Sequence, residues 1–137
     1  MKLTSNLIRD TLICIEDKLN VDSDLLSLDI SSVFWKDIFE DSSLCSKYDM
    51  DDIKYCIYKL YEEDFITAEV RTGGGKIHFI DIYDITWKGY DLLNNIKDDS
   101  VWDYVNKNVK YGSKMSISVL SELAKTALIS FGKSQLF

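Results

Sequence analysis

The sequence predicts a mainly helical α+β fold in which a small antiparallel β-hairpin interrupts a series of helices. Residues 66–70 alternate apolar and polar side chains, and a run of β-branched and aromatic residues, 77–85, returns after three consecutive glycines. Thr86 follows this run directly and can cap a helix. This order is typical of a winged helix-turn-helix, with the hairpin as the wing. We expect residues 1–99 to form that domain.

Three helices are expected before the hairpin, over residues 6–20, 31–41 and 50–63, from apolar side chains at helical spacing. A short strand is predicted between the first two helices, where apolar and polar residues alternate at Leu26, Leu28 and Ile30. Asp49 followed by Asp52 resembles a capping box for the third helix.

The helix after Thr86 should run to about residue 97. Gly89 shares its apolar face with Leu93 and Ile96, although glycine destabilises a helix interior by about 1 kcal/mol. We therefore expect another element to approach closely at Gly89.

Residues 100–137 predict a C-terminal extension of two helices, the first capped by Ser100 with Asp103. The second has the most regular apolar stripe of the chain. It either packs on the winged helix or forms a homodimer interface, whose candidate residues are Leu120, Leu123, Ala127, Leu128 and Phe131. Trp87 and Trp102 are expected to be core residues rather than interface residues.

Composition and charge restrict the possible functions. The chain has 137 residues and a net charge of −7, and it is apolar enough to fold as one unit. Residues 1–99 carry 11 basic and 21 acidic side chains, a net charge of −10, whereas residues 100–137 carry 5 and 2, a net charge of +3. An acidic body disfavours tight nonspecific binding to nucleic acid but permits a local basic strip.

The cysteines indicate reduced thiols in a cytoplasmic protein. Cys14, Cys45 and Cys56 are odd in number and lack paired spacing. We predict no metal site and no cofactor, because a single histidine and scattered cysteines suit neither. The sequence contains no run of about 20 apolar residues, so no membrane association is expected.

Three segments resemble a family of uncharacterised small proteins from low-GC Gram-positive bacteria and their phages and prophages. They are Met1-Lys2 with Leu7-Ile8-Arg9-Asp10, the stretch 55–60 before Phe65-Ile66, and Thr86-Trp87-Lys88-Gly89 continuing to 96–102. The resemblance implies a winged-helix-like fold and a mobile-element setting, without an established activity. The chain departs from the family pattern at Cys56 and Lys97, where histidine and arginine are expected.

DNA binding is the first function hypothesis, because the third helix and the wing carry side chains suited to it. Lysine contacts phosphate or guanine, and tyrosine reaches phosphate or stacks. The candidate residues are Lys54, Tyr55, Tyr58, Lys59, Arg71 and Lys76. Against this, residues 49–64 hold six acidic residues and two lysines, a composition that also fits a helix face that is simply solvated. The charged wing residues have an alternative role too, because such residues keep an exposed hairpin soluble.

The alternative is a non-enzymatic protein-interaction module whose acidic surface binds a host factor or mimics DNA. The charge of −10 over residues 1–99 favours it. An enzyme is not expected, because His78 and Cys56 are the only pair suited to a thiol nucleophile with its base, and no third orienting group is evident.

Overall fold

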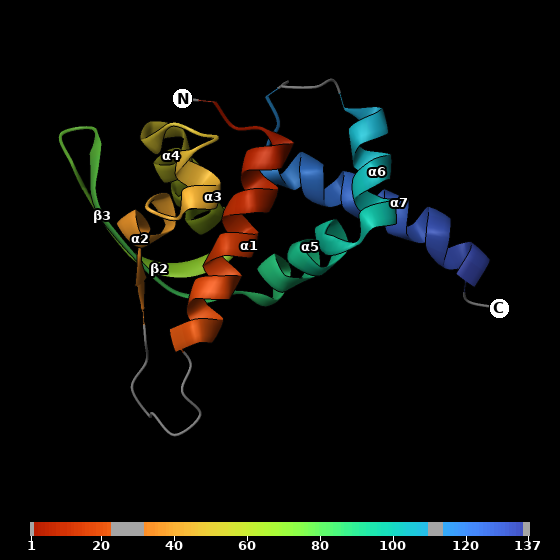
Figure 1. The fold of residues 1–137 in the computed structure, drawn as a ribbon, viewed down its shortest axis with the longest axis horizontal. Coiled ribbons are helices and arrows are strands. Elements are labelled where there is room, and N and C mark those ends of the chain that lie inside the picture. The colour runs from red at the N-terminus through yellow and green to blue at the C-terminus, as the bar shows by residue number, and fades with distance from the viewer. Residues whose placement is uncertain (1, 23–31, 110–113, 136–137) are drawn as a thin grey trace.

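The protein is a helical domain built on one face of a three-stranded antiparallel sheet (Figure 1). The computed structural model describes residues 2–22, 32–109 and 114–135, without the side chains of residues 20–22 and 131–135. In chain order the elements are α1 (Ser5–Asp22), β1 (Val33–Phe34), α2 (Trp35–Phe39), α3 (Ser42–Cys45), α4 (Met50–Glu62), β2 (Ile66–Gly73), β3 (Lys76–Ile85), α5 (Trp87–Lys97), α6 (Asp99–Asn108) and α7 (Ile117–Gln135). The mainly helical α+β class predicted from the sequence is confirmed.

The sheet has the strand order β1-β3-β2, and its main part is the predicted hairpin. β2 and β3 pair from Ile66 opposite Ile85 to Gly73 opposite Lys76. Gly74 and Gly75 form the turn with φ of 61° and 75°, a backbone conformation that favours glycine. The hairpin projects beyond the helices (Figure 1), and residues 71–76 at its tip are exposed.

The region before α4 differs from the prediction. The expected strand at Leu26, Leu28 and Ile30 lies outside the described residues. The expected helix from residue 31 is wrong at its start, because Val33 pairs with Ile82 in the sheet and the helix begins only at Trp35. Pairing with β3 satisfies part of the backbone hydrogen bonding of Val33 and Phe34 and accompanies the burial of Val33, which helical spacing alone did not reveal. The one-turn helix α3 was not predicted.

Two predicted helix caps are wrong in detail. Asp49 is at the N-cap of α4 but makes no side-chain cap bond, and the Asp52 carboxylate accepts a hydrogen bond from the Lys2 backbone amide instead (2.8 Å). α6 is capped by Asp98 rather than by Ser100 with Asp103. The Asp98 carboxylate accepts from the amides of Ser100 (2.9 Å) and Val101 (3.1 Å). Asp98 also ends α5, so α5 and α6 meet without a linker.

α1 lies at the centre of the core. Its side chains Leu7, Ile8, Leu12 and Ile15 are at most 1% exposed. They pack against α2, α4, α5 and α7 and against the inner face of the sheet. Burial of four such side chains, at about 1.5–3 kcal/mol each, makes α1 a major contributor to the core.

The junction between β3 and α5 confirms the sequence-based expectation for Thr86 and Gly89. The Thr86 hydroxyl accepts a hydrogen bond from the Gly89 amide (3.1 Å) and donates to the Asp64 carbonyl (2.6 Å). A Cβ at Gly89 would lie 2.0 Å from the Phe65 carbonyl oxygen. The turn before β2 therefore touches the backbone of α5 directly.

Trp87 is an exception to the predicted core. Trp102 is 9% exposed, as expected, but Trp87 is 94% exposed. The buried side of α5 carries Gly89, Leu92, Leu93 and Ile96, and Trp87 lies two residues from Gly89, which places it on the opposite side of the helix. The prediction that Trp87 is a core residue is wrong.

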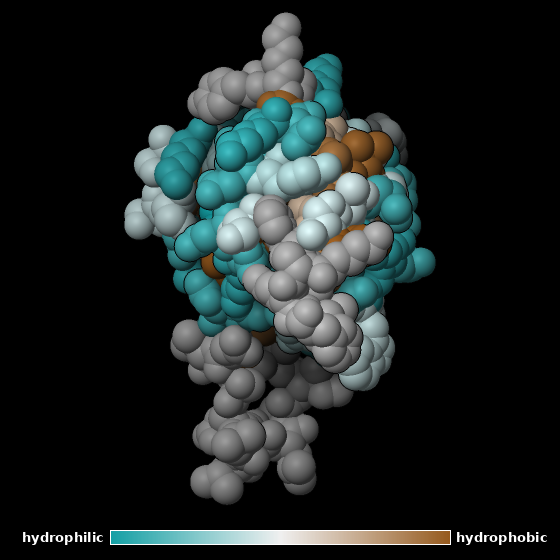
Figure 2. Space-filling view, turned by 90° about the vertical axis from the view of Figure 1, so that its right-hand side faces the viewer, coloured by the Kyte–Doolittle hydropathy of each residue, from teal (hydrophilic) through white to brown (hydrophobic). Residues whose placement is uncertain are grey.

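α7 packs on α5, α6 and α1 of its own chain. Leu120 and Ala127 are fully buried in this packing, Leu123 is partly buried, and Leu128 is 46% exposed. The side chain of Phe131 lies outside the described residues. Figure 2 looks at the side where α5, α6 and α7 lie, and its coloured residues are mostly hydrophilic, with small separate apolar patches. A dimer interface on α7 stays a prediction.

Candidate functional site

A groove of about 640 Å³ lies between α4, the start of α2 and the β-hairpin. Its lining comes from segments far apart in the sequence. The lining residues are Phe34, Trp35, Lys36, Asp51, Lys54, Tyr55, Gly75, Lys76, Ile77 and His78. The hairpin forms one wall and α4 the other, because both are anchored to the core through their buried faces.

The groove is basic although the chain is acidic. Lys36, Lys54 and Lys76 face one carboxylate, Asp51, among the lining residues, which gives the groove a formal charge of +2. Trp35 is buried to 4% exposure, and the Lys54 ammonium lies 4.9 Å from the centre of its ring. This cation–π contact holds Lys54 at the groove wall while its charge remains available.

The structure brings together three of the six predicted nucleic-acid contacts, Lys54, Tyr55 and Lys76. The acids of α4 lie at its two ends, and Lys54 and Lys59 lie between them. The charge of −4 over residues 49–64 therefore overstates the acidity at the middle of α4.

Lys59 belongs to a neighbouring part of the surface. Its ammonium donates a hydrogen bond to Glu62 (2.7 Å), which raises the pKa of Lys59 and lowers the pKa of Glu62. The Glu62 carboxylate also raises the pKa of the Tyr58 hydroxyl, first through its charge and then through a hydrogen bond. Lys59 and Tyr58 thus interact with an acid on their own helix rather than with the groove.

Arg71 is outside the groove. Its guanidinium bonds Glu69 (3.0 Å) and lies 5.2 Å from the centre of the Phe79 ring. The hydrogen bond from Arg71 is also the main cause that lowers the pKa of Glu69. Sequence reasoning missed Lys36, whose sequence context carries no signal of its own and which only the packing of α2 brings beside Lys54.

His78 and Cys56, the pair considered and set aside as a thiol nucleophile with its base, do not form such a pair in the structure. The His78 Nε2 atom lies 2.9 Å from the Gly73 carbonyl oxygen at the hairpin tip. Cys56 is fully buried, and desolvation raises the pKa of its thiol to about 12. Within the described part of the chain, no group of three or more His, Cys, Asp or Glu side chains is arranged to hold a metal ion.

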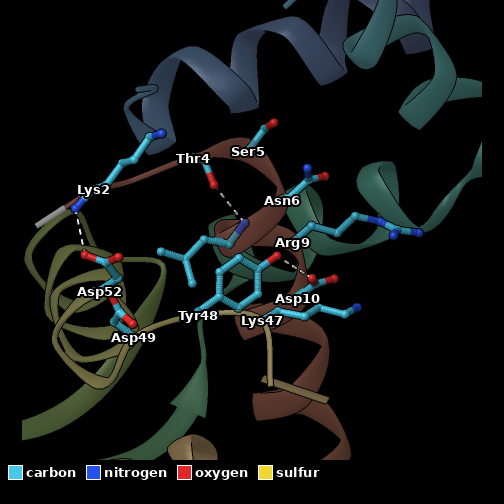
Figure 3. A pocket seen from close by; sticks show the side chains of 11 residues that line it. Lys2, Thr4, Ser5, Asn6, Arg9, Asp10, Lys47, Tyr48, Asp49 and Asp52 are labelled. Atoms are coloured by element: carbon cyan, nitrogen blue, oxygen red, sulfur yellow. Dashed lines mark hydrogen bonds between the residues drawn. The ribbon is translucent and has the colours of Figure 1, made fainter. Parts of the chain in front are cut away.

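A larger hollow of about 690 Å³ lies between the start of α1 and the start of α4 (Figure 3). Its charges balance: Lys2, Arg9 and Lys47 face Asp10, Asp49 and Asp52. Several are already engaged with protein groups, since the Tyr48 hydroxyl donates to Asp10 (2.7 Å) and Arg9 points away to donate to the Ile96 carbonyl (3.1 Å). Arg9 also lies 4.8 Å from the centre of the Trp102 ring. This hollow therefore provides less net charge for a ligand than the smaller groove.

The fold and the groove define a small α+β domain with a basic recess between a helix and a hairpin. Residues 2–115 match the profile of a family described as "Hypothetical protein (DUF2513)", and the chain belongs to that family. No curated protein and no solved structure matches the chain. None of the described helices is long and apolar enough to cross a membrane.

Proposed function

We propose that residues 2–97 form a winged helix that binds double-stranded DNA through the groove between α4 and the hairpin. The element order supports this assignment: α1, a short strand, the helices α2 to α4, and then the β2–β3 hairpin. The strand order β1-β3-β2 joins the short strand to the hairpin in one sheet. In this arrangement α4 is the recognition helix and the hairpin is the wing.

One observation carries the proposal: Lys36, Lys54 and Lys76 come from three different elements and converge on one groove. Three ammonium groups repel one another, and in a chain of charge −7 no composition bias requires them to gather. A polyanion that enters the groove relieves this repulsion and releases its own counterions. The groove is thus electrostatically suited to a phosphate backbone.

The side chains have distinct roles in this proposal. Lys54 and Tyr55, at the middle of α4, face the major groove, where lysine can contact guanine and tyrosine can contact phosphate. Lys76 lies beside the Gly74–Gly75 turn, which lets the wing follow the DNA backbone. Lys36 holds phosphate from the α2 side. The acids at both ends of α4 limit the affinity for nonspecific DNA.

The test is fluorescence anisotropy with a labelled duplex of mixed sequence, titrated at several salt concentrations. The double variant Lys54→Ala/Lys76→Ala should lower the slope of log K against log salt by about 0.9 for each lost contact. Lys107→Ala/Lys125→Ala removes the same charge from α6 and α7 and should leave the slope unchanged. No binding by the wild type at about 50 mM salt, or equal losses in both double variants, would refute the proposal.

A second candidate function is an acidic protein-interaction module, with a mobile-element setting suggested by the resemblance. It is favoured by Trp87, which is 94% exposed and shares a side of α5 with the exposed Asp91. Tryptophan is enriched among residues that dominate protein–protein binding. Such a partner would present a pocket for Trp87 with a basic rim.

Affinity capture from a bacterial lysate at low salt tests this candidate. A partner bound by the wild type and lost with Trp87→Ala, but retained with the exposed apolar control Val119→Ala, is the expected result. Capture of no partner, or equal capture by both variants, counts against it.

A further inference from the structure

We propose that the DNA-binding surface continues from the groove across Tyr55 to the start of α7, where Lys114 contacts the DNA backbone. This inference rests on the proposed function. It makes residues 114–116, which precede α7, part of the binding surface rather than only a support for the winged helix.

A second hollow of about 400 Å³ adjoins the groove and shares Tyr55 with it. Its lining joins the N-terminal segment, the second half of α4 and the start of α7. The lining residues are Leu3, Tyr55, Lys59, Glu63, Lys114, Met115, Ser116 and Ile117. Tyr55 is therefore the common wall of two adjacent recesses.

The residues that follow Lys114 are held in place by contacts with two other parts of the chain, the N-terminal segment and the end of α4. The Met115 amide donates to the Leu3 carbonyl (2.9 Å), and Ile117 is buried to 1% exposure. The Ser118 hydroxyl donates to the Glu63 carboxylate at 3.4 Å, which links α7 to the end of α4. The backbone next to Lys114 is thus fixed relative to the end of α4.

The charges in the second hollow continue those of the groove. Lys59 and Lys114 face one carboxylate, Glu63, and that carboxylate is already bonded to Ser118. Together the two hollows are lined by five lysines and two carboxylates, Asp51 and Glu63, a formal charge of +3. Lys59 also pairs with Glu62 on its own helix, a surface ion pair of a kind that contributes little to stability.

The spacing of the lysines fits an extended polyanion. Lys54 and Lys59 are five residues apart, so they lie about 7.5 Å apart along the axis of α4. Each strand of B-DNA presents a phosphate about every 3.4 Å along the duplex axis, so two lysines with this offset can face different phosphates. A single small anion would occupy only one recess, whereas a DNA strand that passes Tyr55 reaches both.

The experiment compares Lys114→Ala with Lys125→Ala in the salt titration described above, on two unrelated duplex sequences. Lys125 is an exposed lysine further along α7, so its variant has the same charge change. Lys114→Ala should lower the salt slope by about 0.9 and weaken binding equally on both duplexes, and Lys125→Ala should match the wild type. Urea unfolding of both variants verifies that the fold is unchanged.

Two outcomes would overturn the inference, and they are distinguishable. If Lys114→Ala behaves like Lys125→Ala while Lys54→Ala/Lys76→Ala binds DNA more weakly than the wild type, Lys114 takes no part in DNA binding and the groove proposal stands. If the wild type binds neither duplex at low salt, the proposed function and this inference both fail.

Discussion

Replacement of Gly89 by alanine tests the contact between α5 and the turn before β2. The added Cβ would lie 2.0 Å from the Phe65 carbonyl oxygen and 2.6 Å from Cγ2 of Ile85. Real Cβ atoms essentially never approach another atom within 3.0 Å, so α5 must move away from Phe65 by at least about 1 Å. The Phe65 carbonyl also accepts a hydrogen bond from the Thr86 amide (3.1 Å), which the same movement would stretch.

Three effects set the size of the change in the free energy of unfolding. Overpacking costs about 1–3 kcal/mol, and weakening the hydrogen bond costs about 1 kcal/mol more. The better helix propensity of alanine offsets about 1 kcal/mol. The net expectation is a destabilisation of about 1–3 kcal/mol, opposite in sign to the effect of glycine-to-alanine at an open helix position.

Urea unfolding, followed by circular dichroism, measures this difference. With a slope of about 1–3 kcal/mol per M, the midpoint of Gly89→Ala should fall by roughly 1 M. Asn94→Ala is the matched control, because it introduces alanine at an exposed position of α5. If Gly89→Ala is as stable as the wild type or more stable, the close approach is refuted.

The remaining predictions concern a cap, a buried thiol and the exposed tryptophan. Thr86→Ala should lower the free energy of unfolding by about 1–2 kcal/mol through loss of its two hydrogen bonds. Thr86→Ser keeps the hydroxyl and should be nearly as stable as the wild type, so equal free energies of unfolding for the two variants would contradict the cap. Because burial raises the pKa of Cys56 from its usual 9.0 to about 12, the unfolded chain loses this proton first, and stability should fall by about 1 kcal/mol per pH unit above pH 9. In unfolding measured from pH 9 to 10.5, the free energy of unfolding of Cys56→Ala should fall less steeply with pH than that of the wild type. Identical slopes for the two proteins would refute the raised pKa of Cys56. Trp87→Phe should remove most of the acrylamide quenching of native fluorescence, because Trp35 and Trp102 are buried; quenching that persists would show that Trp87 is shielded.

The hairpin and the helix after it were predictable because their signals are local. Alternation over 66–70, glycines able to adopt positive φ and a capping threonine each act within a few residues. The predicted start of α2 was wrong because Val33 gains its partner from β3, almost fifty residues away. Asp52 likewise bonds Lys2 instead of acting as a cap.

The candidate site was predictable only in part. Lys54, Tyr55 and Lys76 followed from the expected positions of the third helix and the wing, and the structure places them in one groove. Lys36 and Lys114 carry no sequence signal, because a lone exposed lysine looks the same wherever the fold puts it. Only the packing of α2 and the start of α7 against α4 brings them near this surface.

The sequence by itself predicted the longer helices, the hairpin, the Thr86 cap and the need for a close contact at Gly89, because these depend on residue type and short-range spacing. That Phe65 makes this contact is known only from the tertiary structure. The tertiary structure alone decided that Trp87 is exposed and that an acidic chain has a basic groove. Exposure and local charge are sums over neighbours from distant segments. They become defined only when the helices pack on the sheet.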